Sequence, residues 1–120
     1  MTTDLRPSPL TDNEYHAKAG AVLASVEACV DAWLQADVVD IDTMRTGGLL
    51  ELSFPNGSKI VINTQPPLHE LWMAARSGGY HYKYVQGVWA DTRDGREFFD
   101  ALSASASEQS GQALRFTPPA

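Results

Sequence analysis

The sequence contains a single cysteine, Cys29, and only nine lysines and arginines among its 120 residues. One thiol excludes an internal disulfide framework and a zinc site built from several thiolates. The net charge of -6 argues against non-specific nucleic-acid binding, which depends on clustered Lys and Arg. Any metal must therefore be held by oxygen or imidazole ligands.

Long apolar runs are absent as well. No stretch approaches the ~20 residues of a membrane helix, and the first ten residues lack both a basic and an apolar leader region. We therefore expect no membrane association and a cytoplasmic location. The sequence also has no Gly-rich phosphate loop, no G-x-S-x-G elbow and no Cys–His pairing signal, so nothing in it indicates an enzyme.

The N-terminal third predicts a tail followed by a long helix. Residues 1–10 are polar and carry Pro7 and Pro9, which predicts a mobile tail before a single domain over residues 11–120. Thr11 and Glu14 have capping-box spacing, and apolar residues then recur at intervals of three and four as far as Trp33. This pattern predicts an amphipathic helix of about six turns.

After this helix the apolar period changes to two. Alternation from Val38 to Phe54, interrupted at Gly47-Gly48, predicts two strands. Asn56-Gly57 predicts a hairpin that leads into a third strand over 59–63. Three further short strands are predicted over 68–74, 80–85 and 88–90.

A second helix closes the predicted domain. Asp94 and Glu97 repeat the capping-box spacing, and Gly111 marks the end of the helix. We expect Leu114 and Phe116 to dock back into the helical layer. The order of elements predicts an α+β two-layer sandwich, with two helices packed on one face of a largely antiparallel sheet of about six strands.

Acidic residues are concentrated in the first third of the chain. Residues 11–42 hold seven acids against one base, Lys18, whereas residues 43–120 hold seven of each. Carboxylate oxygens are hard ligands suited to Fe, Mn, Mg or Ca. We therefore expect weak, multiple and poorly selective cation sites, or alternatively a solvated polar face. At ~100° per residue one helix edge carries Asp12, His16, Glu27 and Asp31, and Asp37, Asp40 and Asp42 follow it.

The three histidines show no H-x-H or H-x-x-x-H spacing that would indicate a preformed transition-metal site. His16 is the best ligand candidate because it lies on the acidic edge, although an exposed, non-ligating imidazole is the alternative. For His69 and His81 we expect structural roles.

Trp72 is a candidate interface residue. If Leu71 and Met73 face the helices, alternation places the Trp72 indole on the open face of the sheet. An exposed Trp close to Asn63 and Gln65 is typical of an interface hot spot. A buried core position for Trp72 is the alternative.

Two stretches closely resemble the bacterial CyaY-type branch of the frataxin family: residues 56–74 and Gly78-Gly79-Tyr80-His81-Tyr82. Flanking features agree with this family too, at Glu14-Tyr15-His16, at Thr46-Gly47-Gly48-Leu49 and over residues 94–102. The resemblance covers about residues 12–116. It implies the two-layer fold that the pattern of elements also predicts.

The resemblance implies an iron-binding adaptor or regulator of iron–sulfur cluster assembly that acts on the complex of cysteine desulfurase and scaffold protein. Iron (Fe2+/Fe3+) is expected to bind weakly and reversibly, with other divalent cations able to substitute. An iron store or ferroxidase-like iron chaperone is one alternative, and an acidic interaction domain without a metal role is another. We expect a monomer that can associate when metal binds. The resemblance assigns the metal-binding ridge to Asp12, Glu14, His16, Glu27, Asp31, Asp40 and Asp42, with Asp37 nearby in the link as a further metal candidate. It matches the family's exposed sheet tryptophan to Trp72, with Asn63 and Gln65 beside it. We expect partner binding through these three residues and through Asp31, Asp40 and Asp42.

The sequence departs from the usual bacterial pattern within this ridge. Ala28 and Ala32 stand where carboxylates are common, Met44 replaces another frequent acid, and the link over 34–36 is about two residues longer. We therefore expect weaker or fewer iron sites than in more acidic relatives. Attraction to a basic desulfurase surface should persist in part, because it depends on the summed field.

Overall fold

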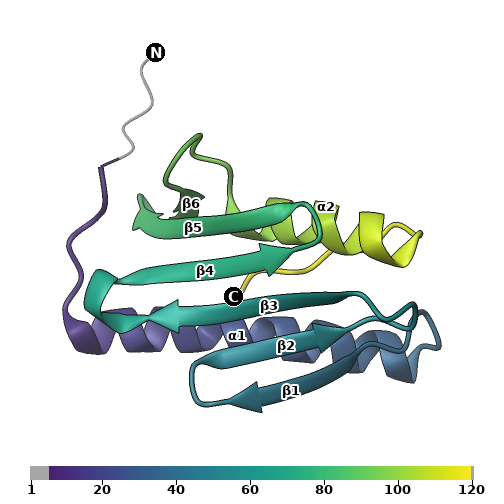
Figure 1. The fold of residues 1–120 in the computed structure, drawn as a ribbon. Helices are drawn as coiled ribbons and strands as arrows, with labels where there is room; N and C mark the ends of the chain where they lie inside the picture. The colour runs from purple at the N-terminus through teal and green to yellow at the C-terminus, as the bar shows by residue number, and fades with distance from the viewer. Residues whose placement is uncertain (1–5, 120) are drawn as a thin grey trace.

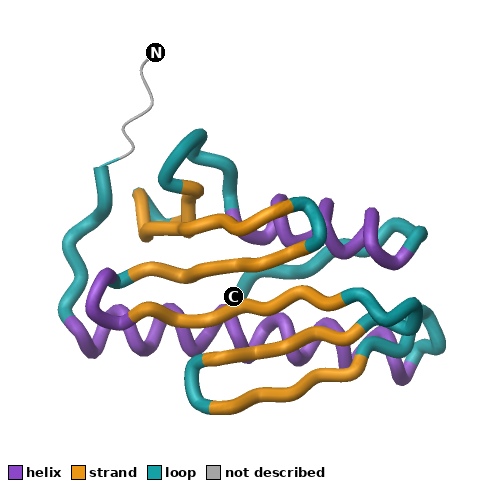
Figure 2. The backbone as a smooth tube through the Cα atoms, in the orientation of Figure 1, coloured by secondary structure: helices purple, strands orange, loops and turns teal. Residues whose placement is uncertain are grey.

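The computed structural model describes residues 6–119. Within them, six strands form one sheet in the order β1 to β6, and each neighbouring pair is antiparallel. Both helices lie on the same face of this sheet (Figures 1 and 2). The predicted two-layer α+β sandwich is therefore confirmed. The elements are α1 (Asp12–Gln35), β1 (Asp42–Thr46), β2 (Leu49–Ser53), β3 (Lys59–Gln65), a 3-10 helix η1 (Pro66–Leu68), β4 (Glu70–Ala75), β5 (Gly78–Val85), β6 (Val88–Asp91) and α2 (Phe98–Ser110).

The core lies between the sheet and the helices. Strand alternation and register align Leu50, Ile62 and Met73 in one row across β2, β3 and β4, where each is at most 2% exposed. Phe116 is fully buried and packs edge-on against Trp33, with ring centroids 4.8 Å apart. The predicted docking of the C-terminal segment is thus confirmed. Neither helix within residues 6–119 combines the length and apolar composition needed to cross a bilayer.

The first strand begins later than the alternation predicted. Asp37 adopts a left-handed conformation (φ 59°), and the N–H groups of Asp37 and Val38 donate to the carbonyls of Leu34 and Trp33. These two bonds form a Schellman motif, which satisfies the last carbonyls of α1 and reverses the chain. Ile41 is buried without belonging to a strand, and β1 starts at Asp42. The alternating residues 38–41 thus belong to a link in which Ile41 is buried, and not to the first strand.

The start of α2 also differs from the prediction. Its N-cap is Glu97, whose carboxylate accepts hydrogen bonds from the backbone N–H groups of Phe99 (2.7 Å) and Asp100 (3.0 Å). Asp94 accepts instead from the N–H of Arg96, within the preceding turn. Asp94 and Glu97 do have capping-box spacing, but Asp94 stabilises the turn before the helix, and Glu97 caps the helix.

Two turns shape the middle of the sheet. The hairpin predicted at Asn56-Gly57 is confirmed, with Gly57 at φ 87° and the N–H of Phe54 bonded to the carbonyl of Ser58. The predicted strand at 68–74 begins instead at Glu70, because η1 occupies Pro66–Leu68 and His69 turns the chain in a left-handed conformation (φ 53°). This turn brings His69 beside the first turn of α1.

Half of the predicted N-terminal tail, residues 1–5, lies outside the described residues. Residues 6–10 run beside the end of β5, where the N–H of Ser8 donates to the carbonyl of Tyr84 and its hydroxyl accepts from the N–H of Gln86. Leu10 packs against the core. The mobility of residues 1–10 and the domain boundary at residue 11 stay predictions.

Candidate metal ridge and docking face

The first two turns of α1 hold three of the proposed metal ligands. Glu14 completes the predicted capping box, since its carboxylate accepts from the N–H of Thr11 (2.9 Å) and the Thr11 hydroxyl accepts from its own N–H (3.1 Å). Hydrogen bonds from the Thr11 backbone and side chain lower the pKa of Glu14. Asp12 and His16 are exposed one turn apart on the same helix face. Glu14 is thus already engaged in holding the helix end.

A histidine expected to be structural lies closest to this acidic cluster. His69 Nε2 is 2.8 Å from Asp12 Oδ1, and the imidazole stacks on Tyr15 with ring centroids 4.8 Å apart and an interplanar angle of 11°. His16 touches the same Tyr15 ring edge-on at 5.5 Å. The contact between His69 and Asp12 spans 57 residues, so no local spacing signalled it.

The middle of the ridge is neutralised by a base. Glu27 forms an ion pair with Arg45, which reaches across from β1. Lys18 is the only base within residues 11–42 of the sequence, but Arg45 from the following strand relieves the repulsion here. The register explains the reach, because Arg45 pairs with Leu50 and so shares the helix-facing side of the sheet.

The remaining four acids lie towards the other end of α1. Asp31 is on the helix, Asp37 and Asp40 are in the link, and Asp42 opens β1. All four are exposed, and none forms an ion pair within residues 6–119. Asp42 pairs in register with Ser53, which places it on the open face of the sheet.

The predicted ridge is thus an extended series of acids rather than one centre. Asp12 and Asp31 are 19 positions apart on α1, which at 1.5 Å per residue corresponds to about 28 Å. In the part of the chain that the structure describes, no three His, Cys, Asp or Glu side chains gather closely enough to hold a metal ion together. Cations bound at the two ends of the ridge would occupy separate sites.

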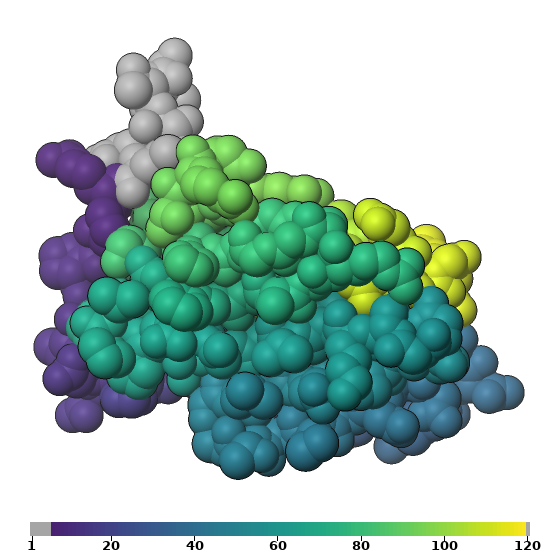
Figure 3. Space-filling view, in the orientation of Figure 1, coloured from purple at the N-terminus to yellow at the C-terminus, as the bar shows by residue number. Residues whose placement is uncertain are grey.

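The open face of the sheet carries Trp72, which is one of the two placements that alternation left open. Leu71 and Met73 face the helices and are buried, whereas Trp72 lies in a cross-strand row with Asn63 on β3 and His81 on β5. The strands form the front surface in Figure 3, and this face lies opposite the helices. The structure therefore brings together the predicted partner-binding residues of the sheet.

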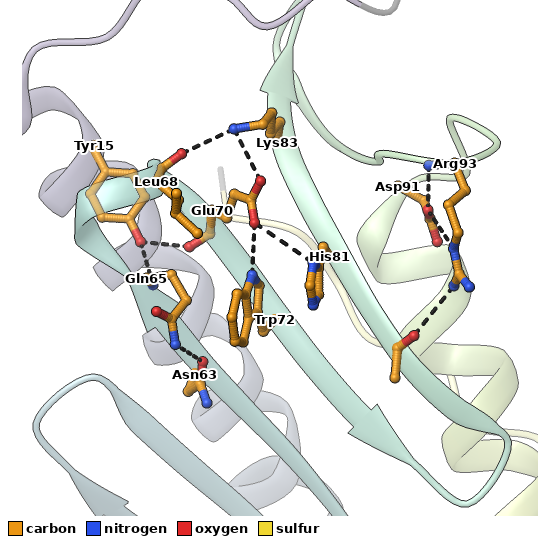
Figure 4. Close-up of polar contacts among 11 residues, drawn as sticks. Tyr15, Asn63, Gln65, Leu68, Glu70, Trp72, His81, Lys83, Asp91 and Arg93 are labelled. Atoms are coloured by element: carbon orange, nitrogen blue, oxygen red, sulfur yellow. Dashed lines mark hydrogen bonds and ion pairs between the residues drawn. The ribbon is translucent and has the colours of Figure 1, made fainter.

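Trp72 is only half-buried, and its packing partner is His81. The two rings stack at a centroid distance of 4.2 Å and an interplanar angle of 6°. Nearby, Gln65 Nε2 donates to Asn63 Oδ1 at 3.1 Å, which orders the two amides (Figure 4). The indole is thus held flat on the sheet instead of projecting freely into solvent.

A buried carboxylate lies at one end of this face. Glu70 is 7% exposed, and its Oε1 accepts from the Trp72 indole N–H at 2.7 Å. Its Oε2 is 3.0 Å from Lys83 Nζ, and His81 Nδ1 is 3.8 Å from Oε1. Burial raises the pKa of Glu70, but the hydrogen bonds from Trp72 and Lys83 outweigh burial and hold the pKa below its usual value. Figure 4 shows these side chains converging from β4 and β5.

The backbone of Glu70 is anchored to α1. The Tyr15 hydroxyl donates to the Glu70 carbonyl at 2.6 Å and accepts from the N–H of Gln65 at 3.0 Å. Burial raises the pKa of Tyr15, so the hydroxyl keeps its proton for this bond. One phenol therefore ties the first turns of α1 to β3 and β4 at the edge of the open sheet face.

Beside Trp72 lies a shallow recess of about 140 Å³. It exists because Ala74 and Gly79 face each other across β4 and β5, where larger side chains would fill the surface. Trp72, His81 and Val61 form part of its lining. The recess has the size of one aliphatic side chain.

The comparisons with known proteins agree on one family. A family model described as a frataxin-like domain matches residues 8–112. The chain belongs to the frataxin-like family. A protein of Burkholderia mallei (strain SAVP1) named "Iron-sulfur cluster assembly protein CyaY" is 50% identical over 108 residues, which cover 90% of this chain and 99% of that protein.

Solved frataxin structures support the fold assignment. Frataxin from Psychromonas ingrahamii, described within the CyaY protein family, is 36% identical with a TM-score of 0.80, covering 90% of this chain and 99% of its own. A trimeric frataxin from Saccharomyces cerevisiae, described as complexed with ferrous, is 22% identical with a TM-score of 0.64 and covers 90% and 93% of the two chains. At that identity, the yeast protein shows a shared fold alone.

The sequence did not point to Glu70 and Lys83 as neighbours of Trp72 on the open sheet face, and we had expected only a structural role for His81. All three surround Trp72 through cross-strand pairing, with Glu70 opposite Lys83 and Trp72 opposite His81. The usable signal was the alternation of Glu70 with Leu71, which placed a carboxylate on the same face as the indole. Burial of the Glu70 carboxylate depends on the ion pair with Lys83, and the register between β4 and β5 that creates this pair was not predictable from local sequence.

Proposed function

We propose that this frataxin-like protein is a non-enzymatic, iron-binding adaptor of iron–sulfur cluster assembly in the cytoplasm. It docks on the complex of cysteine desulfurase and scaffold protein. The observation that carries this proposal is the placement of Trp72, Asn63 and Gln65 on the open sheet face of a chain whose relatives are named for cluster assembly. A stacked indole flanked by ordered amides has the composition of an interface hot spot.

Iron is the cargo in this proposal, held by exposed carboxylates of the ridge. The far group of Asp31, Asp37, Asp40 and Asp42 supports it best, because these acids are exposed and form no ion pair within residues 6–119. The near group of Asp12, Glu14 and His16 is already engaged in part through helix capping and the contact with His69. Such sites bind weakly and reversibly, and other divalent cations substitute, because nothing encloses the ion.

The ridge also supplies an attractive field for a basic partner. Opposite charges across an interface mainly raise the association rate, and this effect weakens with salt. In this account the sheet face provides the contact energy and the ridge steers the encounter. The protein acts as a monomer, and bound metal promotes association between copies.

The test is Trp72→Ala, measured as binding to the purified desulfurase–scaffold complex. Loss of a hot-spot Trp costs about 2 kcal/mol or more, which corresponds to roughly thirtyfold weaker binding. Trp33→Phe is the control, because Trp33 packs against Phe116 in the helical layer, away from the docking face. Equal binding by Trp72→Ala and wild type would reject the docking role.

A further inference from the structure

Burial removes most of the hydration of the Glu70 carboxylate, and its neighbours must offset this loss of free energy. A buried ionised carboxylate is retained only when hydrogen bonds and opposite charge compensate its lost hydration. At 7% exposure, Glu70 has that compensation from one indole N–H and from Lys83, with the His81 imidazole close by. All of these groups lie on the open face of the sheet, and Trp72 is one of them.

The contacts of Trp72 restrict the orientation of its indole. A Trp side chain turns broadly about its second torsion when nothing holds the ring. Here the indole N–H donates to Glu70 Oε1 at 2.7 Å. The indole also stacks on the His81 imidazole, with a centroid distance of 4.2 Å and an interplanar angle of 6°. A turned ring would lose both the hydrogen bond and the stacking.

We propose that Glu70 is a positioning residue of the docking face, which fixes the Trp72 indole flat against His81 and thereby presents it to a partner in one orientation. The bond from Tyr15 holds the Glu70 backbone in place, so the carboxylate itself has a fixed position. An indole that is ordered before binding loses less conformational entropy when it docks. The inference rests on the proposed function only for its effect on partner binding, because the pose is a property of the free protein.

The test uses the indole N–H resonances of the full-length, ¹⁵N-labelled protein, with the Trp72 signal identified by its disappearance in Trp72→Phe. In Glu70→Ala the Trp72 N–H should shift and exchange rapidly with water. In Glu70→Gln an amide oxygen still accepts the bond, so protection from exchange should largely return while the chemical shift differs from wild type. Glu51→Gln is the matched control, because Glu51 lies on the same face, is half-buried and pairs with Lys59 at 3.4 Å.

A pH titration adds a readout that a purely structural role would not change. The groups that contact Glu70 are Trp72 on its own strand, Lys83 and His81 on β5, and the Tyr15 hydroxyl on its carbonyl. Because the pKa of Glu70 lies below the ordinary 4.5, the wild-type Trp72 signal should titrate below pH 4.5. Glu70→Gln should lose this titration and Glu51→Gln should keep it.

The outcomes separate this inference from the proposed function. A folded Glu70→Ala with an unchanged Trp72 signal and unchanged exchange would overturn the positioning role. If Glu70→Ala does not fold, a Glu70→Gln spectrum identical to that of Glu51→Gln at Trp72 would overturn it. Loss of preorganisation should weaken partner binding by about two- to tenfold in Glu70→Ala. Unchanged binding of Trp72→Ala would reject docking through this face and leave the spectroscopic result on Glu70 intact.

Discussion

If the ridge binds cations as proposed, the Arg45–Glu27 ion pair opposes binding at its middle, and Arg45→Gln should strengthen binding there. The substitution removes the positive charge and frees the Glu27 carboxylate. For a divalent ion about 8 Å away in water, the lost repulsion is about 1 kcal/mol, or about fivefold in affinity. The cost in folding stability should stay below about 1 kcal/mol, because the Arg45 and Glu27 side chains are 35% and 32% exposed.

The assay is calorimetric titration with Mn2+ at about 0.01 M ionic strength, where the Debye length is about 30 Å. Arg115→Gln is the matched control, since it removes the same charge from another surface ion pair, with Asp100 on α2, outside the ridge. We expect about fivefold tighter binding in Arg45→Gln and little change in Arg115→Gln. Equal affinities in the two variants would show that net charge, rather than the Glu27 site, governs metal binding.

Three further predictions concern the core and the docking face. The Tyr82 hydroxyl is buried and has no hydrogen-bond partner within residues 6–119; Tyr82→Phe should therefore stabilise the fold by about 1 kcal/mol, and a melting temperature lower than that of wild type would contradict this. Because the folded pKa of Glu70 is depressed, its stabilising contribution is present above the ordinary 4.5 and is lost as the pH falls through the folded pKa. In urea unfolding, the stability advantage of wild type over Glu70→Gln should thus shrink as the pH falls below 4.5, and a gap that stays constant would refute the linkage. Gly79 has open space around an added Cβ, so Gly79→Val should fill the recess beside Trp72 and weaken binding to the desulfurase–scaffold complex at an unchanged melting temperature; unaffected binding would remove the recess from the interface.

Local signals in the sequence were enough for most of the fold. The capping box at Thr11 and Glu14, the Asn56-Gly57 hairpin and the burial of Phe116 all follow from spacing and residue type, and the structure contains each of them. The start of β1 was misplaced because Asp37 takes a left-handed position that usually indicates Gly. Alternation alone does not distinguish a strand from a link whose Ile41 is buried.

The candidate site was predicted in part. Alternation left Trp72 either on the open face or in the core, and the cross-strand pairing with Asn63 shows that it lies on the open face. The contact between Glu27 and Arg45 joins residues 18 positions apart, and the bond from the Tyr15 hydroxyl to Glu70 spans 55. Such contacts depend on register and helix docking, which follow from the folded sheet and not from local spacing.

The most direct test of the adaptor account is binding of the wild-type protein to purified cysteine desulfurase, at low salt and again at physiological ionic strength. The account predicts binding that weakens with salt and that is reduced further when Asp31, Asp40 and Asp42 are all replaced by Asn, because the exposed acids steer a basic partner. Absence of binding at both salt concentrations would contradict it.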